Sequence, residues 1–377
     1  MMTTFPHKVF VERDCLEAPL ARRILGRLRD RPVEAVTDSR EAAERMSGAS
    51  DPVGEGKKNL LLARQRGRFV KPCPCSPGVI GCRYVIIDQV RGCPLDCSYC
   101  LLQEYLGGAP VTVFVNQDDL WRELEGFARR LAGKRRPRIG TGEFGDSLAL
   151  DSLTGLAADF VAFFRRQPGL VFELKTKTVD IEGLLALDPP ENVVVSWSLN
   201  ASSVADAEEH GAPSLEERLR AAARLQKRGY SLGFHFDPLV FFPGWETEYD
   251  RAVELLFRSV PAKSVRWVSL GALRFPPGAR LRMEARFPGS RLPAGEMVVG
   301  PDGKERYFRP HRARLFRTVA RQVRDYGGEG IPLYLCMETA ETWKAGLKKN
   351  PGGKASLERS LSPRESDSCG PMRRPGG

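Results

Sequence analysis

Long hydrophobic runs are absent from this sequence. None of its apolar stretches reaches the roughly 18 residues that a transmembrane helix needs. The first 13 residues are mixed and charged, and they lack the apolar core of a secretory signal peptide. Internal repeats are lacking as well. We therefore expect a cytoplasmic protein in a reducing compartment, with no membrane partner.

Acidic residues are fewer than basic ones. The 377 residues include 58 Lys and Arg but 47 Asp and Glu, which gives a net charge of +11. This surplus suits DNA or another nucleic acid as a partner, because neutralised phosphates supply much of such binding. Arginines on solvated helix surfaces explain the surplus equally well. Charge alone therefore does not identify a partner.

Short apolar strands alternate with amphipathic helices between Arg83 and about residue 275. The predicted strands are 84–87, 138–140, 170–174, 193–198, 231–236 and 265–270. The predicted helices between them are 118–131, 153–166, 181–187, 215–228 and 249–257. This order predicts an α/β protein with a parallel sheet and right-handed crossovers. Six such units suit a partial (β/α)6 TIM-like barrel, whose chemistry gathers at the C-terminal ends of the strands.

The chain outside this region divides into three further parts. Residues 1–80 are predicted to form a basic N-terminal extension with a helix at 20–29, before the barrel at 81–275. Residues 276–343 are predicted to form a C-terminal α/β segment that contacts substrate. Residues 344–377 are rich in Gly, Pro, Ser, Lys and Arg, so we expect a disordered tail there.

Three cysteines stand close together on a predicted loop after the first barrel strand. Cys93, Cys97 and Cys100 have the spacing C-x3-C-x2-C. Three thiolates at this spacing suit a [4Fe–4S] cluster with one iron left open. A closed zinc site needs four ligands and usually pairs two C-x-x-C motifs. The alternative is a set of buried or zinc-binding cysteines.

The cysteine loop resembles the signature of the radical S-adenosylmethionine superfamily, including the aromatic Tyr99 before the last cysteine. The stretch 92–103, GCPLDCSYCLLQ, resembles the spore photoproduct lyase family more specifically. Further likeness lies at 105–107, 111–116, 151–154, 176–177, 197–200, 229–234 and 244–246. The resemblance covers roughly residues 70–340. It implies an enzyme that uses a [4Fe–4S] cluster and S-adenosylmethionine to generate a 5′-deoxyadenosyl radical. It also implies DNA photoproduct repair and a reductant such as flavodoxin or ferredoxin.

The resemblance also assigns roles to individual residues. It implies that Cys93, Cys97 and Cys100 bind the cluster, and that Tyr99, Lys177 and Ser198 lie near the cofactor. A Gly-Gly-Glu-like turn follows the second strand in many such enzymes and binds the cofactor's amino group; Gly142 and Glu143 stand there. Each position has a plainer explanation. Lys177 could be a solvated charge, Ser198 a turn hydroxyl and Glu143 an exposed side chain on a tight turn.

The sequence departs from the lyase family at two positions. The hydrogen-donating cysteine of the family aligns with Glu143, and a family tyrosine aligns with Leu101. A carboxylic acid has no weak bond comparable to S–H, so we expect negligible repair or repair that uses another hydrogen donor. Cys336 is a candidate donor, although a buried structural cysteine is the more ordinary interpretation. Arg306 and Tyr307 match the place where the family contacts DNA.

Other polar residues are less informative. His235 and Asp237 are two positions apart on one strand and can point into one cavity, or they can be core residues. Cys73, Cys75 and Cys82 have no matching ligands nearby, so we expect buried free thiols rather than a metal site.

Two other functions stay open at this point. One is radical chemistry on RNA, a peptide or a metabolite instead of DNA. The other is a non-catalytic iron–sulfur protein that binds nucleic acid. Lys177, Ser198 and the Gly142–Glu143 turn argue against the second, because binding a cluster alone requires none of them.

Overall fold

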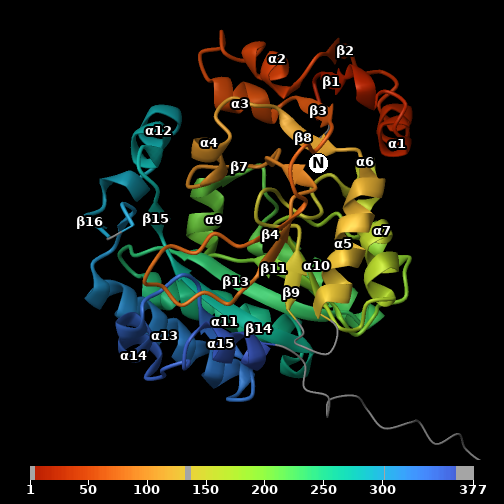
Figure 1. Ribbon diagram of the computed structural model, residues 1–377. Coiled ribbons are helices and arrows are strands. Elements are labelled where there is room, and N and C mark those ends of the chain that lie inside the picture. The colour runs from red at the N-terminus through yellow and green to blue at the C-terminus, as the bar shows by residue number, and fades with distance from the viewer. Residues whose placement is uncertain (1–4, 132–136, 301, 362–377) are drawn as a thin grey trace, which may run out of the picture.

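Two sheets organise the molecule (Figure 1). The computed structural model describes residues 5–131, 137–300 and 302–361. The larger sheet has eight strands in the order β18-β14-β13-β11-β10-β9-β5-β4, and the smaller has five in the order β2-β1-β3-β8-β6. In Figure 1 the smaller sheet lies above the larger one, and the C-terminal helices lie below it.

The eight-stranded sheet is the partial barrel. Its strands are β4 (Val70–Pro72), β5 (Val85–Ile87), β9 (Arg138–Gly140), β10 (Val171–Thr176), β11 (Val193–Ser198), β13 (Ser231–Leu239), β14 (Val265–Ala272) and β18 (Leu333–Leu335). All neighbours are parallel except β4, which runs antiparallel to β5. The six predicted strands and the partial-barrel fold are therefore confirmed.

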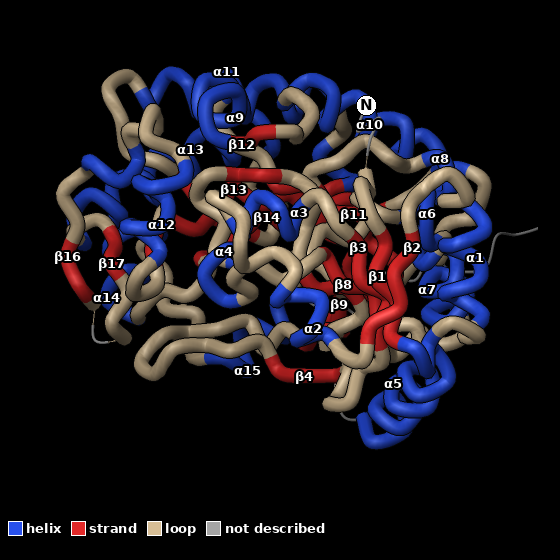
Figure 2. The backbone as a smooth tube through the Cα atoms, turned by 90° about the horizontal axis from the view of Figure 1, so that it is seen from above, coloured by secondary structure: helices blue, strands red, loops and turns tan. Residues whose placement is uncertain are grey.

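Burial explains why these segments form central parallel strands. Val193, Val194 and Val195 are fully buried although they follow one another in sequence. A strand with both faces covered has no polar alternation, which is typical of parallel sheets sandwiched between layers. Figure 2 shows helices along much of the outside, with β11, β13 and β14 in the interior and β4 and β16 at the edge.

The covering helices follow the barrel strands in sequence. They are α5 (Gln117–Leu131), α6 (Asp151–Thr154), α7 (Leu156–Arg165), α8 (Glu182–Leu185), α9 (Ser202–Glu208), α10 (Leu215–Arg228), α11 (Trp245–Ser259) and α13 (Arg309–Gly327). α10 begins at a reciprocal capping box: Glu217 N donates to Ser214 Oγ (3.2 Å), and Ser214 N donates to Glu217 Oε2 (2.8 Å). It ends at Gly229, whose φ of +107° favours glycine.

The N-terminal region differs from the predicted extension. Four of its five strands are parallel: β1 (Val9–Glu12), β2 (Val33–Val36), β3 (Leu60–Ala63) and β8 (Val111–Phe114), with β6 (Val90–Arg91) antiparallel to β8. The helices here are α1 (Pro19–Arg27), α2 (Ser39–Glu44), α3 (Pro52–Lys57) and α4 (Leu102–Tyr105). The helical pattern expected here left out the strands β1, β2 and β3, because four-residue strands carry little periodicity. β6 and β8 come from beyond residue 80, so the extension is not a separate part.

The remaining elements complete the C-terminal part and one ribbon. They are β7 (Asp96–Cys97), β12 (Glu209–His210), β15 (Arg274–Phe275), β16 (Val298–Val299), β17 (Glu305–Arg306), α12 (Ala279–Arg286), α14 (Ala340–Leu347) and α15 (Lys354–Leu361). The expected disordered tail is wrong as far as residue 361, because α15 buries Leu357 and Leu361. Residues 362–377 lie outside the described residues. Among the described helices, none is long and apolar enough to span a bilayer.

The capping box gives a test of local stability. Ser214→Ala should lower the free energy of unfolding by about 1 kcal/mol, because the backbone N–H of Glu217 loses its acceptor. Ser203→Ala, at an exposed position of α9, is the control and should have no comparable effect. Urea unfolding followed by circular dichroism measures both. Equal stability of the two variants would contradict the role of the cap.

Candidate active site

A cavity of about 310 Å³ opens at the C-terminal ends of the central barrel strands. This volume lies at the lower end of the range for small-molecule sites, roughly 300–1,000 Å³. The residues that the sequence assigned to a cluster and a cofactor meet on its wall. They are Cys93, Cys97, Tyr99, Cys100, Gly142, Glu143, Lys177 and Ser198.

The cysteine loop is docked against the turn that follows β9. Gly92 has a φ of +86°, and its N–H donates to the Phe144 carbonyl at 2.7 Å. Gly92 also forms a bridge with Gly145, where a Cβ atom would lie 2.7 Å from the Gly92 carbonyl oxygen. Both glycines are therefore required by the close approach of the two backbones. This contact carries the cysteines to the edge of the barrel.

Lys57 supports the loop from the N-terminal sheet side. Its ammonium group donates to the carbonyls of Cys93 (3.1 Å) and Leu95 (2.6 Å). Burial opposes its charge, but the thiolate forms of the three nearby cysteines and the Asp96 carboxylate outweigh this and raise the pKa of Lys57. A fixed positive charge beside three cysteines favours their thiolate forms, which a metal cluster requires. Sequence reasoning missed Lys57, which it assigned only to a basic stretch.

Cys93 and Cys97 are protonated until something displaces their protons. Burial raises the pKa of Cys97 to about 12, and it raises the pKa of Cys93 well above its ordinary value. Iron binding must therefore release these protons, as metal binding to thiols does in general. The donor set fits a soft metal centre: three sulfur ligands come from one eight-residue loop and line one cavity.

A buried carboxylate links the cysteine loop to the barrel. Glu209 accepts a short hydrogen bond from the Tyr99 hydroxyl and forms ion pairs with Lys177 (3.0 Å) and Arg218. β12, which carries Glu209, pairs antiparallel with β7, so that Glu209 lies opposite Cys97. Burial alone would raise the pKa of Glu209, but Lys177 and Arg218 lower it to about 2. This carboxylate is therefore ionised at neutral pH.

The network changes the expectation for Lys177. The sequence presents Lys177 as a free cation at a strand end, whereas its ammonium lies 3.0 Å from Glu209 Oε1 and 3.3 Å from the Tyr99 hydroxyl. A ligand carboxylate at Lys177 must share the ammonium with these partners. Glu209 and Arg218 escaped the sequence analysis because nothing in the sequence pairs a two-residue strand with the cysteine loop.

The turn after β9 is fixed to the end of β10. Asp146 accepts from the Thr176 hydroxyl (2.6 Å) and from the Lys177 N–H (2.7 Å). Glu143, on the same turn, forms an ion pair with Lys175. Burial opposes the charge of Lys175, yet the Glu143 and Glu173 carboxylates raise its pKa. Asp146 thus positions the turn, and Lys175 neutralises Glu143. The signal that could have found Lys175 is its place two residues before Lys177, near the C-terminal end of β10.

Comparison with known proteins identifies the family. The family model described as spore photoproduct lyase matches residues 4–310. The chain belongs to this family. A spore photoproduct lyase of Clostridium acetobutylicum is 25% identical over 292 residues, which is 76% of this chain and 84% of that protein. The enzyme of Bacillus subtilis strain 168 is 25% identical over 298 residues, 77% of this chain and 85% of that protein.

Solved structures of the family share the fold. A spore photoproduct lyase complexed with a dinucleoside spore photoproduct has a TM-score of 0.77 at 22% identity, covering 88% of this chain and 98% of that one. A variant lyase with bound S-adenosylmethionine and dinucleoside spore photoproduct has a TM-score of 0.77 and covers 89% and 99%. The predicted family is confirmed, and with it the prediction of a radical S-adenosylmethionine enzyme of the lyase type.

Two residues that the lyase resemblance linked to DNA lie away from the cavity wall. Arg306 is buried and forms an ion pair with Asp302. Tyr307 is also buried, and its hydroxyl accepts from Phe241 N at 3.2 Å. Both side chains are occupied in holding the C-terminal segment together. Neither residue lines the cavity, so their contact with DNA stays a prediction.

The other single residues divide between the wall and the core. Asp237 lines the cavity and forms an ion pair with Arg274 (3.3 Å). His235 is inside the barrel, with Nε2 at 2.8 Å from Glu173 Oε1, which favours the core interpretation. Cys336 does not line the cavity, although the next residue, Met337, does. Cys73, by contrast, does line it.

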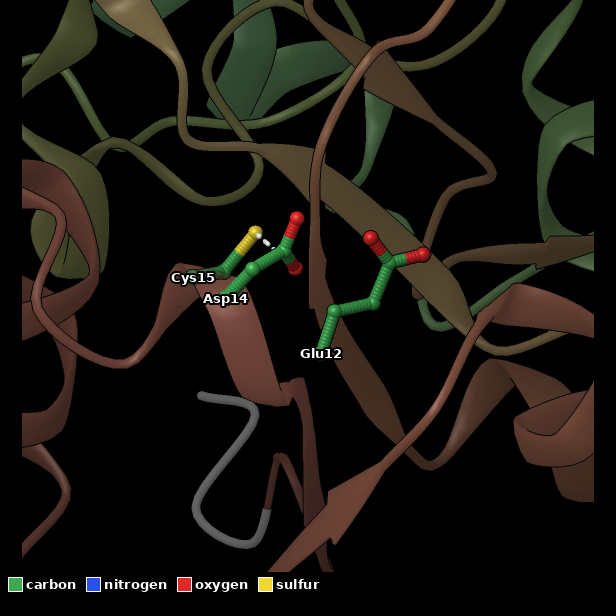
Figure 3. Close-up of side chains that lie close together, drawn as sticks. All are labelled: Glu12, Asp14 and Cys15. Carbon is green, nitrogen blue, oxygen red and sulfur yellow. Dashed lines mark hydrogen bonds between the residues drawn. The ribbon is translucent and has the colours of Figure 1, made fainter.

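A second group of side chains of the types that bind metals lies far from the cysteine loop in sequence (Figure 3). Glu12, Asp14 and Cys15 bring their ligating atoms within 4.8 Å of one another. Cys15 donates to Asp14 at 3.6 Å, and Glu12 accepts from Arg66 Nη1 at 2.9 Å. Burial and Asp14 raise the pKa of Cys15 to about 12. These side chains are satisfied by one another and by Arg66.

The Glu209 network predicts a large and pH-dependent effect on stability. Glu209→Gln should lower the free energy of unfolding at pH 7 by about 3 kcal/mol, because the buried Arg218 loses its counter-charge. The folded pKa of Glu209 is below its ordinary 4.5, so its stabilisation is complete above 4.5 and is lost as pH falls through about 2. Urea unfolding at several pH values measures this difference.

The control for this prediction is Glu216→Gln, at an exposed position in the first turn of α10. It should change stability little at any pH. A Glu209→Gln variant as stable as this control at pH 7 would show that the carboxylate is dispensable.

Proposed function

We propose that this protein binds a [4Fe–4S] cluster and S-adenosylmethionine, and that it repairs a thymine photoproduct in DNA by radical chemistry. The observation that carries the proposal is the shared cavity, whose wall combines three cysteines with Lys177, Ser198 and the Gly142–Glu143 turn. A protein that only held a cluster would need the cysteines but not the charged and hydroxyl groups that face them.

The cluster is proposed at Cys93, Cys97 and Cys100. Three protein ligands leave one iron available to the cofactor. When reduced by one electron, such a cluster supplies the reductive cleavage of S-adenosylmethionine to methionine and a 5′-deoxyadenosyl radical. We propose a one-electron donor of the flavodoxin or ferredoxin class. The task of the chain is to bind the cofactor, orient it and exclude water.

Three groups are suited to hold the cofactor's amino-acid end. Lys177 follows β10 and Ser198 ends β11, and these two strands are hydrogen-bonded neighbours. The ammonium of Lys177 and the hydroxyl of Ser198 can both donate to a carboxylate. Gly142 leaves room at the turn, since a Cβ there would lie 2.7 Å from the Cβ of Lys175. Glu143 can accept from the cofactor's ammonium while it remains paired with Lys175.

The final step is proposed to differ from that of the lyase family. The resemblance aligns Glu143 with the family's hydrogen-donating cysteine and Leu101 with a family tyrosine, and both residues line the cavity. The O–H bond of a carboxyl group is too strong to release a hydrogen atom to a carbon radical. Hydrogen return therefore needs a different side chain.

The substrate assignment rests on the relatives and on the charge of the cavity. A solved family member binds a dinucleoside spore photoproduct. The cavity wall of this chain includes four cations, each paired with one carboxylate, whose remaining N–H donors suit a ligand with phosphate groups: Lys175, Lys177, Arg274 and Lys304. RNA and small metabolites can carry phosphate too. Turnover of a defined photoproduct separates DNA repair from these alternatives.

The cluster assignment predicts which cysteines bind iron. After anaerobic reconstitution, the wild-type protein should contain close to four iron atoms per chain, with broad visible absorption from sulfur-to-iron charge transfer. Replacing Cys93, Cys97 and Cys100 by Ala should abolish both signals. The control is the triple variant at Cys73, Cys75 and Cys82, which should retain them. Full iron content in the first variant would overturn the assignment.

The activity assay tests the function itself. Reduced, reconstituted protein should cleave S-adenosylmethionine to 5′-deoxyadenosine, and with a dinucleoside spore photoproduct it should also release thymidine. Lys177→Ala should raise the Kd of S-adenosylmethionine by roughly 10- to 150-fold, because it removes a charge-assisted contact of about 1.5–3 kcal/mol. Chromatography with mass detection quantifies the products, and equilibrium dialysis gives the Kd.

The control for this change is Lys227→Ala, an exposed lysine of α10. It should leave the Kd unaltered. Cofactor cleavage without any change in the photoproduct would refute the DNA substrate and leave radical chemistry on another molecule. Normal cofactor binding by Lys177→Ala would instead show that this lysine does not contact the cofactor and acts only through its ion pair with Glu209.

A further inference from the structure

One of two neighbouring thiols outside the cluster loop lies on the wall of the same cavity. Cys73 and Cys75 follow β4, and Cys73 is on the cavity wall together with Cys93, Cys97 and Glu143. The sequence predicts buried free thiols here. The structure instead gives one of them access to the space in which the proposed reaction takes place, from the strand beside the cluster loop's own strand, β5.

Radical repair creates a need for a hydrogen donor. Removing a hydrogen atom from the photoproduct and breaking the bond between its two bases leaves a carbon radical on the product. This radical must gain one hydrogen atom to become an ordinary base. Among protein side chains, the S–H bond of cysteine and the phenolic O–H bond of tyrosine are weak enough to supply this hydrogen atom. Lysine, arginine and carboxylate groups on the wall cannot make this transfer.

Few side chains on the described wall offer such a hydrogen. The three cluster cysteines lose their protons when they bind iron. The Tyr99 hydroxyl is hydrogen-bonded to Glu209, and Tyr105 is largely exposed. Among the described residues that line the cavity, Cys73 is then the remaining thiol.

We propose that Cys73 is the hydrogen-atom donor to carbon radicals in this cavity. Resting on the proposed function, the inference assigns to Cys73 the final step of photoproduct repair, which the position of Glu143 cannot perform. The pair Cys73 and Cys75 thereby gains a role that the cluster does not supply.

The segment that carries the pair is firmly held. Cys73 N donates to the Tyr84 carbonyl at 2.9 Å, which extends the β4–β5 pairing by one residue. Farther along, Ile80 N donates to the Glu338 carbonyl at 2.9 Å. A Cβ at Gly81 would lie 2.2 Å from the Cys75 sulfur, so glycine leaves the space that this sulfur occupies. Cys73 is therefore positioned by backbone contacts on both sides.

The pKa values of the two thiols are shifted in opposite directions. The hydrogen bond from Cys73 to Cys75, together with burial, raises the pKa of Cys73 above its ordinary value. The same bond lowers the pKa of Cys75 to about 6, and the nearby Lys354 and Lys304 lower it further. Cys73 thus keeps the hydrogen that a donor requires, next to a partner that accepts and releases protons near neutral pH.

The proposed step balances in atoms and electrons. The product carbon radical takes the hydrogen atom of Cys73; a C–H bond forms, the S–H bond breaks, and a sulfur-centred radical remains on Cys73. One electron from the flavodoxin- or ferredoxin-class donor and one proton from solvent, relayed by Cys75, restore the thiol. The 5′-deoxyadenosine formed at the start is not reconverted. One S-adenosylmethionine is therefore consumed for each photoproduct repaired.

Cys336 is less suited to this role. It does not line the cavity, and its sulfur lies 3.9 Å from Arg274. The sequence singled it out because it ends a strand, but Met337 occupies the wall position there. Cys82 is farther along the same segment as Cys73, and its sulfur accepts from Arg138 at 3.1 Å. Both make matched controls.

Deuterium transfer from solvent tests the proposal on the reconstituted holoenzyme. In D2O, thiol hydrogens exchange and carbon-bound hydrogens do not. Without substrate, the 5′-deoxyadenosine from slow cofactor cleavage should carry solvent deuterium. With the dinucleoside spore photoproduct, the released thymidine should carry it. Cys73→Ala and Cys73→Ser should each lower both labelled fractions at least tenfold, whereas Cys82→Ala and Cys336→Ala should match the wild type.

The outcomes separate this proposal from the proposed function. Unchanged labelling in both Cys73 variants would overturn the donor role, whether or not the photoproduct is repaired. Labelling of 5′-deoxyadenosine that depends on Cys73, without photoproduct turnover, would support the donor and refute the DNA substrate. Iron content and cofactor binding equal to wild type in Cys73→Ser show that the cavity is intact. Label lost only in Cys336→Ala would place the donor there.

Discussion

The Glu209 carboxylate is the interaction on which the site depends. It lies between the cysteine loop and the barrel and is shared by Tyr99, Lys177 and Arg218. Because Arg218 and Glu209 are both buried, neither charge is stable without the other. The network therefore fixes the last two cysteines of the loop relative to the end of β10. It also sets how strongly Lys177 can attract a ligand.

Sequence reasoning found the elements that depend on local pattern. The cysteine spacing, the near-continuous apolar strand 193–195 and the strand-end Lys177 each carry a signal within a few residues. Glu209 carries none, because its role arises from a two-residue strand paired with another 110 residues away. Lys57 escaped for the same reason. Its partners are backbone carbonyls of the cysteine loop, and backbone groups leave no trace in sequence.

Arg306 and Tyr307 carry a signal in the sequence that does not reveal where their side chains lie. An arginine beside a tyrosine in a basic segment is chemically suited to nucleic acid, but residue type does not reveal burial. Asp302 and the backbone of Phe241 already occupy these side chains. The sequence likewise offered Cys336 as a candidate hydrogen donor and placed Cys73 among buried free thiols. Tertiary packing alone decides that Cys73 lies on the cavity wall and that Cys336 does not, although its neighbour Met337 does.

The two sheets are interleaved along the chain. β6 and β8 belong to the N-terminal sheet, yet they enclose the cysteine loop, which docks on the barrel. Neither sheet is complete in a fragment cut near residue 80, and the fragment beginning there also loses Lys57. The barrel is therefore not a transplantable module. Grafting its catalytic loop onto another (β/α) scaffold would require carrying over the first sixty residues, because the support beneath the loop is encoded there.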